Sequence, residues 1–189
     1  MIEYIAETHT YLKDGVIIPS VTQIIHKMMP NKYSGIPARV LEKAAAYGDL
    51  VHESIEDYNR TGTVPENEVE NVIKRYRTIA EANKITVTSQ EEIVSYKDMF
   101  AGRYDILGSV KEKPAIIDIK TTSNYDDKYL SIQLTMYRMA LREAGIEVEK
   151  AYCMYLPKKK TGMLIQVKFQ DETELIKKIE NVALNNSEE

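Results

Sequence analysis

Two apolar segments rich in β-branched residues, 99–110 and 115–122, constrain the fold of this chain more than any other feature. The connection between them, 111–114, is short and polar and ends in proline. Apolar runs that flank such a connection are typical of a β-hairpin. The sequence therefore predicts two adjacent antiparallel strands, with Val110 opposite Ala115 across a four-residue loop.

Three charged residues interrupt this apolar hairpin: Asp105 in the first strand, and Asp118 and Lys120 in the second. Side chains alternate between the two faces of a strand, so Asp118 and Lys120 share one face while Ile117 and Ile119 share the other. In the predicted register, Asp105 lies opposite Lys120 and is the diagonal neighbour of Asp118. Such neighbours are about 7–8 Å apart at the backbone, which allows two carboxylates to converge on one ion. A slip of one residue would move Asp105 to the other face.

Two hypotheses account for these charges, because a buried charge is costly unless it is paired or binds a metal. In the first, Lys120 forms a salt bridge with one aspartate, and the remaining charge is solvated on an open face of the sheet. In the second, Asp105 and Asp118 bind a divalent cation, and Lys120 lines the same site. The sequence on either side of the hairpin bears on the choice between them.

The composition is that of a globular protein: of 189 residues, 43% are hydrophobic and 29% are charged. This length predicts one domain, 1–189, with an N-terminal hairpin and helices in 1–84 and the sheet core in 85–189. No apolar run approaches membrane-spanning length, and the N-terminal residues do not resemble a signal peptide. We therefore expect a cytoplasmic protein with no membrane association.

Cysteine and charge set further limits. Cys153 is the only cysteine, which excludes an internal disulfide and a cysteine-built zinc or iron–sulfur site within this chain. The net charge of −4 does not by itself indicate nucleic-acid binding. A local basic strip matters more than the sum. The candidates for such a strip are Lys158, Lys159 and Lys160 at a predicted turn, Arg138 and Arg142 on a predicted helix, and Lys111 and Lys113 at the hairpin.

The remaining pattern predicts an α/β (α+β) fold, a central mixed sheet flanked by helices, with the N-terminal helices as an arch over the cleft. Period, caps and breakers place the elements as follows: a hairpin at 4–18, helices at 21–29, 38–60 and 66–83, a strand from Ile85 onward, the hairpin described above, a helix at 128–144, strands at 150–157 and 163–169, and a helix at 172–184.

Two predicted helices, one before and one after this hairpin, carry residues of interest at one-turn intervals on one face. Gly48, His52 and Glu56 follow one another at one-turn intervals on the predicted helix 38–60, and Gln133 and Tyr137 do so on the helix after the hairpin. Each also has a structural explanation. His52 lies among apolar residues and suits the edge of the core, bonded to a backbone carbonyl, while Gln133 and Tyr137 suit an ordinary amphipathic helix.

In order along the chain, these residues form the patterns Gly48-x-x-x-His52-x-x-x-Glu56, Gly102-x-x-Asp105, Asp118-Ile119-Lys120-Thr121-Thr122 and Gln133-x-x-x-Tyr137. Taken together, the patterns resemble the PD-(D/E)XK nuclease superfamily, in particular its RecB-like branch with Cas4-like and phage-type exonucleases. The resemblance covers about half of the chain. It implies a restriction-endonuclease-like fold.

The resemblance also implies a divalent metal site, whose ligands would be His52, Asp105, Asp118 and the backbone carbonyl of Ile119. Oxygen ligands suit Mg²⁺, whereas a histidine ligand favours Mn²⁺. The cysteines that bind an iron–sulfur cluster in Cas4-like relatives are absent, so no such cluster is expected.

The other roles implied by the resemblance concern water and substrate. Asp105, Asp118 and Lys120 would be catalytic, and Lys120 would orient or deprotonate the attacking water. Gln133 and Tyr137 would position the DNA backbone or an active-site loop. Further candidate acids, between which the pattern does not choose, are Glu56, Glu91 and Glu92.

The function implied is hydrolysis of DNA phosphodiester bonds, first of all by an end-dependent exonuclease in recombination, repair or phage DNA processing. The alternatives are a structure-specific or restriction-type endonuclease, and a catalytically silent DNA-binding module with the nuclease fold. The expected partner is DNA with linear ends or single strands, together with a recombination or single-strand-binding protein. A bacterial or phage source is expected, and the oligomeric state is left open.

Overall fold

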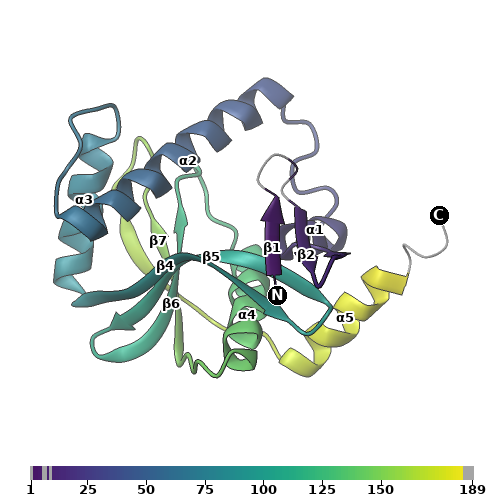
Figure 1. Ribbon diagram of the computed structural model, residues 1–189. Helices are drawn as coiled ribbons and strands as arrows, with labels where there is room; N and C mark the ends of the chain where they lie inside the picture. Colours follow the sequence, from purple (N-terminus) through teal and green to yellow (C-terminus); the bar gives the residue numbers. More distant parts are fainter. Residues whose placement is uncertain (1, 6–7, 9, 185–189) are drawn as a thin grey trace.

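The structure is a computed structural model that describes residues 2–5, 8 and 10–184. Its elements follow the predicted order, except that a further strand, β1, extends the N-terminal hairpin (Figure 1). The elements are β1 (Ile2–Ile5), β2 (Thr10–Lys13), β3 (Val16–Ile18), α1 (Val21–Met28), α2 (Ala38–Thr61), α3 (Glu70–Ala82), β4 (Ile85–Tyr96), β5 (Phe100–Val110), β6 (Lys113–Lys120), α4 (Asp127–Glu143), β7 (Lys150–Tyr155), β8 (Met163–Val167) and α5 (Glu172–Leu184).

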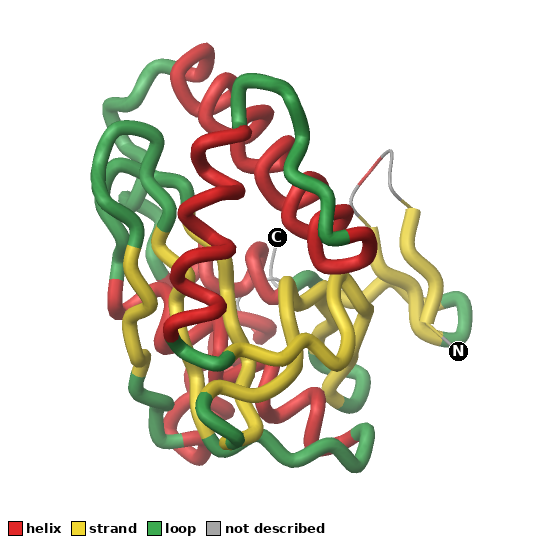
Figure 2. Tube along the Cα trace, turned by 90° about the vertical axis from the view of Figure 1, so that its left-hand side faces the viewer, coloured by secondary structure: helices red, strands yellow, loops and turns green. Residues whose placement is uncertain are grey.

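The centre of the fold is a five-stranded mixed sheet in the order β4-β5-β6-β7-β8. Strands β6 and β7 are parallel, and the other neighbouring strands are antiparallel. The described part of α5 packs with α1 and α4 in one apolar cluster, while α2 and α3 pack on the sheet in another. Figures 1 and 2 show α2 and α3 on one side of the sheet. This arrangement confirms the predicted fold class.

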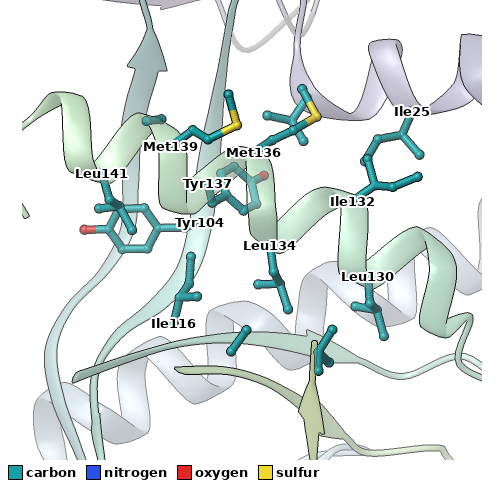
Figure 3. Packing of buried hydrophobic residues seen from close by; sticks show 14 of the residues in the cluster. Ile25, Tyr104, Ile116, Leu130, Ile132, Leu134, Met136, Tyr137, Met139 and Leu141 are labelled. Carbon is teal, nitrogen blue, oxygen red and sulfur yellow. The ribbon is translucent and has the colours of Figure 1, made fainter. Parts of the chain in front are cut away.

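Strand β6 is buried on both faces because helices cover the sheet on each side. Ile116 packs on the α4 side with Leu134 and Leu141 (Figure 3). Ile117 and Ile119 pack instead with the residues of α2 and α3. The alternation predicted for this strand therefore places Asp118, between these two isoleucines, on the α4 side.

The loop of the central hairpin differs from the prediction. Val110 pairs with Lys113 rather than with Ala115, so only Lys111 and Glu112 form the turn. Both turn residues have positive φ, 49° and 68°, as a two-residue type I′ turn requires. Lysine and glutamate carry no signal for this conformation, whereas Pro114 suggested a longer loop.

The corrected register changes which residues face each other across the hairpin. Ile106 pairs with Ile117, so the next residues along the two strands, Asp105 and Asp118, are level with each other. The predicted pairing of Asp105 with Lys120 is therefore wrong. Because the displacement amounts to two residues, the side-chain faces are unchanged.

Gly108 faces a backbone carbonyl at close range, and we expect its replacement to destabilise the fold. A Cβ atom at position 108 would lie 1.8 Å from the carbonyl oxygen of Thr86, beside the bulge between Val87 and Ser89. We expect Gly108→Ala to lower the free energy of unfolding by about 3 kcal/mol, the upper part of the usual range for overpacking. Urea denaturation followed by circular dichroism measures this loss.

Gly48→Ala is the matched control, because the added Cβ would meet only Thr121 Oγ1, at an ordinary 3.6 Å. Gly48 lies inside α2, where alanine is preferred over glycine by about 1 kcal/mol. We expect this variant to be as stable as the wild type or slightly more stable. Equal stability of the two variants would contradict the close approach at Gly108.

None of the helices within the described ranges is both long enough and apolar enough to cross a membrane.

Candidate active site

His52 connects α2 to the sheet. The neighbouring Val51 is fully buried against the sheet, which holds this part of α2 close to the strand ends. Nε2 of His52 lies 3.3 Å from the carbonyl oxygen of Ile119. Its Nδ1 lies 3.4 Å from Oε1 of Glu91 and 3.7 Å from Oδ1 of Asp105. The imidazole therefore joins α2 with β4, β5 and β6.

His52, Glu91 and Asp105 form a group that could hold a metal ion, with donor atoms that all lie within 4.8 Å of one another. In the part of the chain that the structure describes, this group does not include Asp118. The backbone N–H of Ile119 donates to Oδ2 of Asp105 at 2.6 Å, which fixes that carboxylate. Two carboxylates and one imidazole are a donor set that suits Mn²⁺ and accommodates Mg²⁺.

The protonation of His52 reflects the two acids beside it. Burial lowers its pKa, but the charge of Asp105 and the hydrogen bond with Glu91 outweigh this effect and raise the pKa to about 9. The imidazolium therefore offsets one of the two carboxylate charges. A divalent cation would have to displace this proton. The group therefore has the charge that a bound cation would neutralise.

Lys120 and Asp118 form an ion pair beside this group. Nζ of Lys120 lies 2.6 Å from Oδ2 and 2.8 Å from Oδ1 of Asp118, whose side chain is only 3% exposed. Burial lowers the pKa of Lys120, but Asp118 and Asp105 outweigh burial and raise the pKa above its ordinary value. The salt bridge of the first hypothesis is therefore present. In this state Lys120 can donate a hydrogen bond but cannot accept a proton.

The two candidate acids of β4 have different surroundings. Glu91 belongs to the metal-capable group, whereas Oε2 of Glu92 accepts a hydrogen bond from the Tyr104 hydroxyl at 2.8 Å. Glu91 has a positive φ of 52°, which is uncommon outside glycine. The positive φ of Glu91, for which the sequence carries no signal, determines which of the two acids approaches His52.

Glu56 is the third candidate acid, and its carboxylate lies outside the metal-capable group. Its backbone carbonyl instead accepts a hydrogen bond from Nε2 of Gln90 at 3.0 Å. The helix turn that carries Glu56 thus helps to fix β4, in which Glu91 follows Gln90.

Gln133 and Tyr137 are both buried, at 7% and 5% exposure. The Tyr137 hydroxyl donates to the carbonyl oxygen of Arg103 at 2.8 Å, two residues before Asp105. Oε1 of Gln133 is buried without a partner in the described structure. This placement makes Tyr137 a support for β5, and contact of either side chain with substrate stays a prediction.

The glycine of the Gly102-x-x-Asp105 pattern has a steric cause. A Cβ atom at Gly102 would lie 2.8 Å from Cε1 of Tyr137 and 3.0 Å from Cγ2 of Val21. Only glycine therefore lets the Tyr137 ring approach β5 closely enough to reach the Arg103 carbonyl.

Arg103 is a residue of the site that the sequence analysis missed. Its Nε lies 2.9 Å from Oε2 of Glu91, and half of its side chain is exposed. The exposed guanidinium places positive charge at the edge of an acidic group. The single sequence signal was its position inside the Gly102-x-x-Asp105 pattern.

Removing the Tyr137 hydroxyl tests its support of β5. We expect Tyr137→Phe to lower the free energy of unfolding by about 1–3 kcal/mol, because the Arg103 carbonyl loses its buried partner. We also expect weaker Mn²⁺ binding in calorimetry, because Asp105 lies on the strand segment that is released. Tyr152→Phe is the control, since no hydrogen bond of its hydroxyl is observed within the described ranges. A loss of stability with unchanged Mn²⁺ affinity would limit Tyr137 to packing.

Comparison with known proteins places these observations in a family context. The family model of the PD-(D/E)XK nuclease superfamily matches residues 24–188. No curated protein matches the chain. The crystal structure of SSO0001 shares the fold at a TM-score of 0.50 and 14% identity, over 87% of this chain and 74% of that chain. A crystal structure from Eubacterium rectale, of a provisionally named exonuclease, has a TM-score of 0.44 and 14% identity over 77% and 65% of the two chains.

Proposed function

This chain belongs to the PD-(D/E)XK nuclease superfamily, and from that membership we propose that it is a divalent-metal-dependent deoxyribonuclease that degrades DNA from its ends. The observation that carries the proposal is the group His52, Glu91 and Asp105 next to the Lys120–Asp118 pair. Two clusters of paired acidic and basic side chains, with His52 and Lys120 about one quarter exposed, are unusual next to the apolar core of a sheet. Their residue types are those that phosphodiester hydrolysis needs.

The donor set fits a divalent cation. Asp105, Glu91 and His52 would hold it, and Asp118 and the Ile119 carbonyl are the further predicted ligands. When bound, such a cation stabilises the negative charge that develops on the phosphate. The Ile119 N–H keeps Asp105 in one orientation, and this preorganisation supports both cation binding and catalysis.

Lys120 and Arg103 would act on the substrate through hydrogen bonds. The Lys120 ammonium, held by Asp118 and 24% exposed, would donate to a phosphate oxygen or to the attacking water. Arg103 uses Nε on Glu91, so its terminal nitrogens would contact a phosphate beside the site. Both contacts would place a positively charged donor where negative charge develops on the phosphate, which is how hydrogen-bond donors accelerate such steps.

Cleavage of linear and closed circular DNA of one sequence tests the proposal. With Mn²⁺ or Mg²⁺, we expect end-labelled linear DNA with single-stranded ends to be degraded and the closed circle to stay intact, and EDTA to stop the reaction. Lys120→Met should be inactive. Lys113→Met is its control, because Lys113 lies at the opposite end of β6 and forms an exposed pair with Glu149.

Other outcomes would favour the alternatives. Conversion of the circle to linear or nicked DNA would indicate an endonuclease. Binding of DNA without cleavage under any metal condition would indicate the silent DNA-binding module.

A further inference from the structure

Three connections meet at the carboxyl end of β6, next to Lys120. They are residues 29–37 between α1 and α2, residues 121–126 between β6 and α4, and residues 156–162 between β7 and β8. The site described above uses none of their side chains. Their contacts with one another nevertheless make a continuous surface.

Lys32 joins the first two connections. Its Nζ lies 3.0 Å from Oδ2 of Asp126 and 3.6 Å from the centre of the Tyr129 ring. Only 16% of the Lys32 side chain is exposed, so this link is largely shielded from water. Tyr33 follows Lys32 in the chain and Tyr125 precedes Asp126, so this ion pair brings the two tyrosines to the same part of the surface.

Among the tyrosine and phenylalanine residues of the described ranges, only Tyr33 and Tyr125 are exposed, at 41% and 42%. Each ring is supported from one side. Tyr33 packs edge-on against His26, with ring centres 5.5 Å apart, and Tyr125 packs edge-on against Tyr155, also at 5.5 Å. A supported ring with an open face is the arrangement that stacks on a nucleobase.

Both tyrosines lie close to the candidate catalytic lysine. Tyr155, which supports Tyr125, pairs directly with Lys120 between β6 and β7. On the other side, the charge of Lys120 acts to lower the pKa of Tyr33, although burial raises it overall. Both tyrosines therefore belong to the same end of β6 as Lys120.

A basic turn completes this surface. Nζ of Lys160 donates to the carbonyl oxygen of Ser123 at 3.0 Å, so the third connection rests on the second. Lys158 and Lys159 on the same turn are exposed. Lys158 forms an exposed ion pair with Glu68 at 3.5 Å, whereas the described structure shows no acidic partner for Lys159 or Lys160. Positive charge thus lies next to the open tyrosine rings, although the whole chain is acidic.

We infer that Tyr33 and Tyr125 stack on unpaired bases while the 158–160 turn contacts the phosphates, so that the substrate is the end of a single strand of DNA. We name Tyr33 and Tyr125 together the tyrosine platform. The inference rests on the proposed function for what happens to the bound strand. A duplex hides the faces of its bases, whereas a single strand offers every base to an aromatic ring.

Binding without cleavage tests the platform independently of turnover. The wild-type chain in EDTA is titrated into fluorescent dT₂₀, into an abasic strand of equal length, and into a blunt duplex of the same length. We expect dT₂₀ to bind most tightly, because the abasic strand has the same charge but no base to stack. Tyr33→Ala and Tyr125→Ala should each weaken dT₂₀ binding by about tenfold, as expected for loss of one base–aromatic contact, while abasic binding changes little.

The conservative variants and a control separate stacking from folding. Tyr33→Phe and Tyr125→Phe should keep the affinity for dT₂₀. Ile146→Ala, an exposed apolar residue in the connection that reaches Pro114 at the opposite end of β6, should have no effect. Equal losses for dT₂₀ and the abasic strand, or no loss in either alanine variant, would overturn the inference.

A fluorescence reporter gives a second measurement, since the chain contains no tryptophan. In Tyr33→Trp, the single indole should be quenched by dT₂₀ and not by the abasic strand. Absence of quenching at saturating dT₂₀ would contradict stacking at this position.

The failure of this inference is distinguishable from the failure of the proposed function. Cleavage that does not discriminate between single strands and duplexes, and does not depend on the tyrosines, would remove the platform and leave the nuclease. Tyrosine-dependent binding of dT₂₀ without metal-dependent cleavage would support the tyrosine platform and contradict the proposed nuclease function.

Discussion

Replacing Asp118 by alanine is expected to abolish metal-dependent DNA cleavage and to destabilise the metal-free fold by about 3 kcal/mol. The carboxylate lies within 2.6–2.8 Å of the Lys120 ammonium. Its removal leaves a largely buried cation without its main partner. Because 24% of the Lys120 side chain is exposed, the low end of the usual cost of breaking a buried pair applies. Urea denaturation in EDTA measures the stability, and cleavage of labelled DNA measures the activity.

The double variant Asp118→Ala/Lys120→Met is the control for this effect. It removes both charges, so we expect it to recover most of the lost stability while it stays inactive. The stability of the single variant in EDTA compares two effects: loss of the Lys120–Asp118 pair, which destabilises the fold, and relief of the repulsion between Asp105 and Asp118, which stabilises it. If Asp118→Ala were more stable than the wild type in EDTA, repulsion between the carboxylates would outweigh the pair with Lys120.

Replacing Asp105 by alanine is expected to remove the stabilisation that Mn²⁺ confers, together with cleavage. A ligand that binds only the folded state stabilises it by about 2.7 kcal/mol at 100 times its dissociation constant. Asp105 is central to the metal-capable group and is oriented by the Ile119 N–H. We therefore expect Mn²⁺ to raise the melting temperature of the wild type and to leave that of Asp105→Ala unchanged.

The adjacent acids of β4 provide a matched pair for this experiment. Glu91→Gln should reduce the response of the melting temperature to Mn²⁺, because Glu91 belongs to the same group. Glu92→Gln should keep the full response, because that carboxylate is engaged by Tyr104. A full response in Asp105→Ala, or equal responses in the two glutamate variants, would mean that the cation binds elsewhere.

Much of the architecture could be predicted from the sequence, because it follows from local periodicity. Successive side chains of a strand point to opposite faces, so the common face of Asp118 and Lys120 in β6 needs no tertiary information. The helices begin and end near the predicted residues for the same reason. The first turn of the third helix is an exception, because it starts at Glu70 rather than at position 66.

The hairpin register shows where local information ends. The φ angles of Lys111 and Glu112 are positive although neither residue favours them, and the strand pairing imposes this turn. The prediction that Asp105 and Asp118 share a face remains valid because the register differs from the predicted one by two residues. A displacement by one would have moved Asp105 to the other face.

For the candidate site, the sequence determined only which residue types occur and in which order along the chain. Contacts between distant segments decide the rest. They determine which acid of β4 approaches His52 and that Arg103 pairs with Glu91. They also determine that Tyr137 supports β5 through the Arg103 carbonyl. The charge states of His52 and Lys120 depend on the same contacts, because a pKa is set by burial and by the charges that the fold brings near. Periodicity acts over a few residues and is readable in the chain, whereas these contacts exist only after the sheet and α2 have packed together.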